Sequence, residues 1–395
     1  MGCATQPETF LIKAKQYSKE GNYDQATKTL TKALSKYPDL VEAYYERGLA
    51  WDNIGDYKRA ELDFNKAIQL NPDHYLAYTC RGLMFVKQND YDRALADYNT
   101  AIDIKPDYCL PYHNRGIVWL SKEKNDVEKA RDDFSQAIKL MPQLCDSLYF
   151  RGVCDEELGD YEYAIADYTK TIQCDPMIKD AYFKLGSILM NIGQYDQAIE
   201  LYNCLLETFP GTLKAYVNLS NAWLEKRNYD NAIANVTEAI QLNHADGMLY
   251  ILRGHLWTIK NDINKAVNDY RQAIAINPND VEACDALAWI LATSPDNNIR
   301  NGDEALKLSR IAISKEPENL EFLSTLAAAL AEEGEFTSAV DTMENAMDLA
   351  KKKGDPKLIA KLEKCLDSYK SKKPWRDEGF GLRGSEIDQS SSGNE

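Results

Sequence analysis

The side chains best suited to chemistry in this chain are nine cysteines and four histidines. Thiolates and imidazoles bind metal ions and act as nucleophiles or bases. Here they are scattered, without a C-x-x-C pair or a group at the spacing of a metal site. We therefore expect no metal and no cofactor, and we expect cysteines within the folded region to behave as small buried or half-buried hydrophobic residues. A disulfide framework is not expected in a large helical core.

Motifs of known catalytic sites do not occur in the sequence either. It has no glycine-rich phosphate loop, no H-E-x-x-H and no nucleophile elbow. The histidines lie in four different repeats of the pattern described next, so no acid–base group assembles. They are His74, His113, His244 and His255. We predict that the chain is not an enzyme.

A 34-residue period organises most of the chain. The segment from Val41 to Pro72 returns 34 residues later, with Tyr78 in the place of Tyr44 and Ala94 in the place of Ala60. Each period contains two helix-length segments, which is typical of stacked pairs of helices. The closing turns fall at Pro72, Pro106, Pro142, Pro176, Pro210, His244 and Pro278.

The residue types within one period have a mechanical explanation. An aromatic residue near the start of the first segment and a bulky residue seven positions later, such as Tyr44 and Trp51, share one helix face. Gly48 has no side chain, which lets the two helices of a pair approach closely. The turn from Gly55 to Tyr57 suits the end of one helix and the start of the next. Packing thus accounts for most of the tyrosines.

With Tyr44, Gly48, Ala60 and Pro72 in this frame, and the frame repeated, the chain resembles the tetratricopeptide repeat family over residues 8–349. The resemblance implies an all-α fold, a right-handed superhelical α-solenoid of stacked helix-turn-helix repeats. It also implies a non-catalytic scaffold that binds a protein in a concave groove lined by the first helices, for the assembly of a complex. The last third, from LAWILATSPDNNIRNG onward, is similar to C-terminal modules of bacterial members, which implies a bacterial source.

The sequence predicts four segments along the chain. Residues 1–8 form an N-terminal tail, residues 9–349 an array of about ten repeats, and residues 355–370 a C-terminal capping helix. Asp355 is the expected N-cap of that helix and Pro356 its first residue. Residues 371–395 are expected to form a disordered tail, with disorder established by about Glu378.

Arginine and aspartate occur together in five repeats. Where an arginine precedes the repeat glycine, an aspartate occupies one fixed site in the second helix, and the other repeats lack both residues. We predict five half-buried salt bridges within repeats: Arg47 with Asp63, Arg81 with Asp97, Arg115 with Asp133, Arg151 with Asp167, and Arg253 with Asp269. A stripe of arginines that binds anions is the alternative, but unpaired aspartates would not accompany each arginine.

We define the first-helix face as the residues just after the tyrosine of each first helix and four positions beyond. It comprises Tyr45, Leu49, Thr79, Leu83, His113, Ile117, Tyr149, Val153, Phe183, Ser187, Val217, Asn221, Ile251 and His255. The face is largely apolar, so we predict that it binds an amphipathic helix or an extended peptide. Two devices known in the family are not expected here. The slots of a carboxylate clamp hold Leu, Ile and Val, and the slots of an asparagine ladder form no ladder, because they run Glu46, Cys80, Asn114, Phe150, Lys184, Asn218 and Leu252.

The net charge of −16 limits the class of partner. A nucleic-acid-binding protein needs a basic stripe, and adsorption to anionic lipid also needs positive charge. We therefore expect a protein or peptide partner of unidentified sequence and no nucleic acid. Self-association is a further hypothesis, in which the groove of one copy holds the segment from Trp375 to Leu382 of another.

The N-terminal residues offer a second functional hypothesis. Gly2 and Cys3 resemble the junction at which bacterial lipoproteins are cleaved and lipidated, so a signal peptide would precede Met1. The chain would then be a membrane-anchored factor in envelope or pilus assembly, facing the periplasm. N-myristoylation of Gly2 fits poorly because the sixth residue is Gln6. If Cys3 is not lipidated, the cysteine-rich chain suits a reducing cytoplasm.

Overall fold

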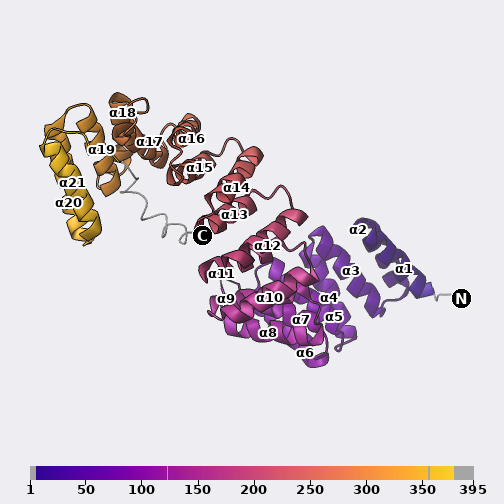
Figure 1. The fold of residues 1–395 in the computed structure, drawn as a ribbon. Coiled ribbons are helices and arrows are strands. Elements are labelled where there is room, and N and C mark those ends of the chain that lie inside the picture. Colours follow the sequence, from indigo (N-terminus) through magenta and orange to yellow (C-terminus); the bar gives the residue numbers. More distant parts are fainter. Residues whose placement is uncertain (1–5, 122, 355, 378–395) are drawn as a thin grey trace. The chain divides into compact units, whose positions relative to one another are not determined.

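The structure is a computed structural model that describes residues 6–121, 123–354 and 356–377. These residues form 21 helices and no strand (Figure 1). The predicted all-α repeat fold is therefore confirmed. Consecutive helices pair, so that repeat 1 contains α1 and α2, and repeat 10 contains α19 and α20. The chain divides into two compact units, residues 1–185 and 186–395, with the boundary inside α11.

Unit 1 contains the first five repeats and the start of the sixth. Its helices are α1 (Gln6–Lys19), α2 (Tyr23–Lys36), α3 (Val41–Ile54), α4 (Tyr57–Leu70), α5 (Tyr75–Lys87), α6 (Tyr91–Ile104), α7 (Cys109–Trp119), α8 (Val127–Leu140), α9 (Cys145–Glu157), α10 (Tyr161–Cys174) and the first part of α11 (Lys179–Asn191).

Unit 2 contains the rest of α11 and the remaining helices. They are α12 (Tyr195–Thr208), α13 (Leu213–Glu225), α14 (Tyr229–Leu242), α15 (Gly247–Ile259), α16 (Ile263–Ile276), α17 (Val281–Thr293), α18 (Gly302–Lys315), α19 (Leu320–Glu332), α20 (Phe336–Lys353) and α21 (Pro356–Lys370).

Local sequence signals set the ends of these helices. Gly55 ends α3 in the left-handed conformation, with φ of 87°, which glycine adopts without strain. The next residue, Asp56, is the N-cap of α4, and its carboxylate accepts a hydrogen bond from the backbone N–H of Arg59. One short turn therefore stops the first helix of the repeat and starts the second.

Glycine and small residues control the distance within each pair. An ideal Cβ atom built at Gly82 would lie 2.7 Å from Cε1 of Tyr98, so no larger residue fits there without displacing the ring. Tyr98 and Ala94 are fully buried on α6. The close packing that the period predicts is thus a contact between a glycine of the first helix and an aromatic ring of the second helix.

The second helix of the last repeat extends further than predicted. Helix α20 continues to Lys353, four residues beyond the predicted end of the array at 349, and Gly354 follows it with φ of 76°. Helix α21 begins at Pro356 as expected, and Leu362 and Tyr369 are buried in a cluster with α20. Asp355, the predicted cap, lies outside the described residues.

Residues 371–377, which belong to the tail predicted from residue 371, make specific contacts within unit 2. The backbone N–H of Lys373 donates a hydrogen bond to the carbonyl of Ser368, and that of Asp377 donates to the carbonyl of Thr293. Trp375 packs against two apolar clusters of unit 2. The prediction rested on the polar composition of the segment and gave no weight to Trp375, its one large apolar side chain that packs against the array. Residues 378–395 lie outside the described residues.

Candidate functional site

The first-helix face of unit 1 carries apolar and aromatic side chains that remain partly accessible. Tyr45, Leu49, Ile117 and Val153 are half-buried. Leu83 is 42% exposed, which is high for a leucine on a packed helix. These side chains leave an apolar surface partly accessible, while Tyr45, Leu49 and Ile117 also pack against the core clusters of their repeats.

An aromatic cluster, defined here as His113, Phe134, Tyr149, Phe150 and Tyr168, lies within repeats 4 and 5. The ring centroids of His113 and Phe134 are 5.7 Å apart, and those of Tyr149 and Phe150 are 5.3 Å apart. Phe134 and Tyr168 are fully buried, whereas His113, Tyr149 and Phe150 are half-buried. The buried rings hold the accessible ones in place from beneath.

His113 is built into this cluster. Its Nδ1 atom lies 2.7 Å from the hydroxyl oxygen of Ser147, in the first helix of the next repeat. Burial lowers the pKa of His113, although the charge of Asp146 acts in the opposite direction. The neutral imidazole is therefore favoured, and it can present an aromatic edge to a ligand.

Tyr45 and Cys80 form a second contact between neighbouring first helices. The Tyr45 hydroxyl lies 3.6 Å from Sγ of Cys80, and the Tyr45 ring lies 5.0 Å from that of His74. Burial raises the pKa of both Tyr45 and Cys80. The thiol form of Cys80 is favoured, which argues against a nucleophilic role.

Two of the predicted face residues are not accessible, which corrects the prediction. Thr79 is 4% exposed, and its hydroxyl donates to the backbone carbonyl of Tyr75. Ile251 is 1% exposed and belongs to an apolar cluster with Tyr270 and Trp289. The period places both on the first-helix face, but it does not determine how closely neighbouring helices cover each position.

The other predicted face residues vary in accessibility. Phe183, at the end of unit 1, is half-buried. In unit 2, Ser187 is exposed, and Val217 and Asn221 are half-buried. His255 is also half-buried, with its ring 5.6 Å from that of Tyr270 and its Nε2 atom 3.8 Å from a carboxylate oxygen of Glu282.

The five arginines lie against their predicted aspartates. Nε and Nη2 of each arginine donate one hydrogen bond to each carboxylate oxygen, over 2.6–2.8 Å. Such two-pronged pairs are stronger and more specific in geometry than single contacts. Burial raises the pKa of Asp63, and the hydrogen bonds from Arg47 oppose that shift. The arginines are thus engaged inside the array, which disfavours the alternative of an anion-binding stripe.

Each of these arginines also reaches the preceding repeat, which the sequence analysis missed. Nη1 of Arg47 donates to the hydroxyl of Thr31 over 3.0 Å, and Nη1 of Arg253 donates to that of Thr237 over 3.1 Å. The Arg47 guanidinium also lies over the Tyr44 ring, 5.7 Å from its centroid. A spacing of 16 residues between a short polar residue and the arginine was the available signal.

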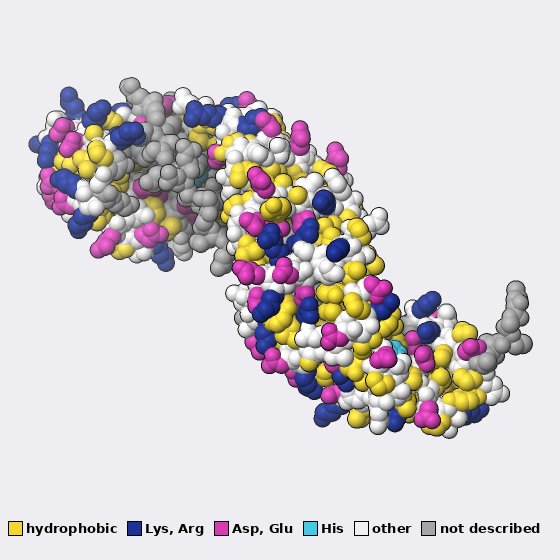
Figure 2. All heavy atoms as spheres, turned by 90° about the horizontal axis from the view of Figure 1, so that it is seen from below, with side chains coloured by type: hydrophobic (Ala, Val, Ile, Leu, Met, Phe, Trp, Pro, Cys, Tyr) yellow, Lys and Arg dark blue, Asp and Glu magenta, His cyan; other side chains and the backbone are white. Residues whose placement is uncertain are grey.

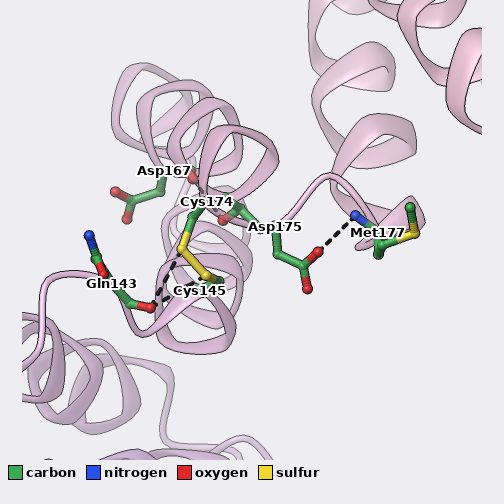
Figure 3. Close-up of a disulfide and its surroundings, with 7 residues drawn as sticks. Gln143, Cys145, Asp167, Cys174, Asp175 and Met177 are labelled. Carbon is green, nitrogen blue, oxygen red and sulfur yellow. Dashed lines mark hydrogen bonds between the residues drawn. A yellow bond between two sulfur atoms is a disulfide. The ribbon is translucent and has the colours of Figure 1, made fainter.

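A disulfide joins Cys145 and Cys174, which corrects the prediction that these two are unpaired, buried or half-buried hydrophobic residues (Figure 3). Cys145 is the first residue of α9 and Cys174 the last of α10, so the bond closes the open end of repeat 5. In repeat 2 the same two positions hold Val41 and Leu70. The helix pair brings these ends together, a relation that the scattered cysteine spacing does not reveal.

The carbonyl oxygen of Gln143 faces both sulfur atoms in Figure 3, at 3.4 Å from Cys145 and 3.5 Å from Cys174. Cys174 is exposed and Cys145 is half-buried, so a reductant in solution can reach the bond. Cys204 is also exposed, which is a further departure from the buried or half-buried cysteines that we predicted.

Neither a metal site nor a membrane span is found in the part of the chain that the structure describes. No group of histidine, cysteine or acidic residues there could hold a metal ion. None of the described helices is long and apolar enough to cross a bilayer.

On the face seen in Figure 2, acidic, basic and hydrophobic side chains are interspersed, without a basic stripe. Cys3, the candidate lipidation site, lies outside the described residues.

Comparison with known proteins gives matches to repeat families. Tetratricopeptide repeat models match residues 8–40, 41–74, 183–245 and 249–280, and a model described as TPR repeat matches residues 82–122. No curated protein matches this chain.

Several solved structures are similar to the chain. YrrB, described as a TPR protein with an unusual peptide-binding site, is 25% identical with a TM-score of 0.42, over 47% of this chain and 94% of that one. The C-terminal part of a TPR repeat-containing protein from Cytophaga hutchinsonii is 18% identical with a TM-score of 0.53, over 62% and 98%. Yeast Tom70 is 17% identical with a TM-score of 0.41, over 92% and 96%.

The family matches cover repeats in both units, and the Cytophaga structure shares the fold. The 34-residue period, the paired helices and the glycine–aromatic contacts give the physical basis of these matches. The chain belongs to the tetratricopeptide repeat family.

Proposed function

We propose that this chain binds an amphipathic helix or an extended segment of a partner protein on its first-helix face. Its repeats support the broader role of a protein–protein interaction scaffold with protein or peptide partners. Repeat proteins of this family are generally non-catalytic, and we propose that this chain assembles its partner into a complex without chemical change.

The observation that carries the proposal is the aromatic cluster of repeats 4 and 5. Half-buried Tyr149 and Phe150 stand on fully buried Phe134 and Tyr168, with centroids 5.8 Å apart for Tyr149 and Tyr168. Aromatic side chains held rigid in this way lose little conformational freedom on binding and often dominate binding energy. Ile117 and Val153 extend the same surface with aliphatic groups.

The electrostatics of the chain favour a protein partner. The net charge of −16 opposes binding to polyanions, and the five repeat arginines are engaged with aspartates. A partner segment that combines apolar residues with some basic ones would suit both the first-helix face and the overall charge.

Affinity capture from native lysate tests the proposal. One bait is the intact chain, and a second carries Tyr149→Glu, Phe183→Glu and His255→Glu, which place charge on half-buried face positions. The control bait carries Leu62→Glu, because Leu62 is 68% exposed on a second helix. We expect a partner that the intact and control baits retain and the triple variant loses, with circular dichroism confirming that all three are folded. Equal capture by every bait would refute the proposed surface.

A membrane-anchored lipoprotein of envelope or pilus assembly is the second candidate function. The disulfide between Cys145 and Cys174 favours it, because structural disulfides persist in oxidising compartments such as the periplasm. The hypothesis predicts codons for a charged and then apolar signal upstream of Met1, and a mature protein whose Cys3 carries lipid. Mass spectrometry of the N-terminal peptide from the native source would test it, and an unmodified Cys3 would reject it.

A further inference from the structure

Residues 375–377 lie against helices α17 and α19 of unit 2 through several kinds of contact. The carboxylate of Asp377 accepts a hydrogen bond of 3.0 Å from the indole N–H of Trp289. The backbone N–H of Asp377 donates to the carbonyl of Thr293, also over 3.0 Å. Nη2 of Arg376 lies 2.7 Å from a carboxylate oxygen of Glu332. The two helices therefore contact the main chain of the segment, its acidic side chain and its basic side chain.

Trp289 occupies a position of the first-helix face, and the other two contacted residues, Thr293 and Glu332, lie one helical turn beyond that position on their first helices. Trp289 is the residue of repeat 9 that corresponds to Leu49 in repeat 2, and Thr293 lies one helical turn beyond it. Glu332 holds the same position in repeat 10 as Thr293 in repeat 9. The segment therefore lies where the family fold would present a partner peptide.

We infer that the surface formed by Trp289, Thr293 and Glu332 is a peptide-binding site, which the chain's own residues 375–377 occupy and keep closed. The ligand class is an extended segment with an aromatic, a basic and an acidic residue in succession. This inference rests on the proposed function, because it assumes that the first-helix face of the array binds segments of protein.

The chemistry of the site is specific for such a segment. Trp375 packs between the cluster around α17 and the cluster around α20 and α21, so an aromatic residue has an apolar seat. Arg300 holds Glu332 from the other side, with Nε 3.0 Å from the second carboxylate oxygen. The carboxylate is thereby fixed in orientation to receive a guanidinium.

Space for a longer segment adjoins the contact. A pocket of about 560 Å³ lies beside Asp377, lined among others by Lys260, Ile263 and Ile299. It combines an ammonium group with aliphatic side chains. A partner segment that continues past its acidic residue could fill this pocket, within unit 2.

The occupying segment has features of a displaceable ligand. Pro374 and the residues from Trp375 to Asp377 are only half-buried, and Lys372 and Lys373 are exposed. The segment has no regular secondary structure of its own. A tethered ligand of this kind competes at an effective concentration in the millimolar range. It therefore lowers the apparent affinity of the site for a free peptide by about tenfold to hundredfold, even when each of its own contacts is weak.

A peptide added in trans tests the inference with the full chain. The probe is a fluorescein-labelled peptide with the sequence of residues 371–377, and binding is followed by fluorescence anisotropy. In the variant with Trp375→Ala, Arg376→Ala and Asp377→Ala, the tethered segment loses its aromatic anchor and both polar anchors, and circular dichroism shows whether the variant is folded. We expect this variant to bind the peptide at least about tenfold more tightly than the intact chain does.

Two controls make the outcome specific. Lys372→Ala with Lys373→Ala changes exposed side chains outside the contact and should bind the peptide no better than the intact chain. Adding Glu332→Gln to the opened variant should weaken its binding again. If the folded opened variant does not bind the peptide, or the intact chain binds it equally well, the inference is wrong.

Hydrogen exchange of the intact chain gives an independent reading. A displaceable segment opens locally, so the Asp377 amide should exchange much faster than the amides of α17. Exchange of Asp377 at the rate of α17 would show a fixed structural element and overturn the inference. Neither readout involves the aromatic cluster of unit 1, so equal capture of partners by every bait, which would refute the proposed function, leaves these two readouts unaffected.

Discussion

Arg47 donates hydrogen bonds of 2.7 Å from Nε and from Nη2 to the two carboxylate oxygens of Asp63, across the helix pair of repeat 2. Both side chains are largely removed from water, at 19% and 8% exposure. In repeat 9 the same two positions hold Leu287 and Leu308, which are buried in one apolar cluster. The fold therefore fills one site either with a charged pair or with two leucines.

This alternation predicts a strong asymmetry between single and double substitution. Arg47→Leu should cost about 3–5 kcal/mol in the free energy of unfolding, because it leaves the Asp63 charge buried without its partner. The double variant Arg47→Leu with Asp63→Leu should be close to the intact chain, since it reproduces the pair of repeat 9. Urea unfolding of both variants measures the difference, and a double variant as unstable as the single one would contradict the account.

The contact between Gly82 and Tyr98 predicts the effect of one added methyl group. Gly82→Ala should destabilise the chain by about 1–3 kcal/mol, although alanine is the better helix former, because Tyr98 is fully buried and cannot move aside. Gly211→Ala is the matched control, since a Cβ atom there meets no atom within 4 Å. Thermal unfolding compares the two, and equal melting temperatures would refute the close contact.

The disulfide predicts a stability that depends on redox conditions. Closing the loop between Cys145 and Cys174, 29 residues apart in sequence, should contribute about 3 kcal/mol relative to the reduced chain. Reductant should lower the melting temperature of the intact protein but not that of Cys145→Ser. The control, Cys204→Ser, removes an exposed free thiol and should keep the response to reductant. Alkylation of all nine cysteines without prior reduction would show that the bond does not form.

The environment of His113 predicts a loss of stability in acid. Its pKa is lowered in the folded chain, so the unfolded chain binds more protons below the ordinary histidine pKa. This contribution to stability is complete above about pH 6.5 and declines as the pH falls through the folded pKa. His113→Gln should flatten the dependence of urea midpoints on pH between about 5 and 7, whereas His244→Gln, at an exposed turn, should not. The same slope in all three proteins would refute the assignment.

The sequence predicted the architecture because repetition makes the period visible. The residues that fix the helix pairs, such as Gly48 and Tyr44, recur in phase, and the joint occurrence of Arg47 and Asp63 across repeats identified a contact between the two helices of a pair. These features repeat within one sequence, so they can be detected without any other.

Features that occur once were not predictable in this way. Cys145 and Cys174 have counterparts in other repeats that are not cysteine, so no periodic signal marked the disulfide. Trp375 lies in a polar segment, and its packing depends on a place formed by α17 and α20 that no local pattern encodes. The burial of Ile251 likewise depends on neighbouring repeats rather than on its own.

The sequence predicted which positions form the first-helix face, while the accessibility of each position depends on packing. Tyr149, a predicted position, is half-buried because Tyr168 fills the space beneath it. Thr79 takes an equivalent position but turns its hydroxyl to its own helix. Sequence position alone could not separate these cases.

Site-specific photocrosslinking tests the central claim, that the first-helix face of this array binds a partner protein, most directly. A photoreactive phenylalanine analogue replaces Tyr149 on the face in one protein, and Tyr163, which is 63% exposed on the second helix α10, in the other. After irradiation in native lysate, the account predicts a discrete crosslinked partner for position 149 and none for position 163. Crosslinks to the same proteins from both positions, or from position 163 alone, would contradict it.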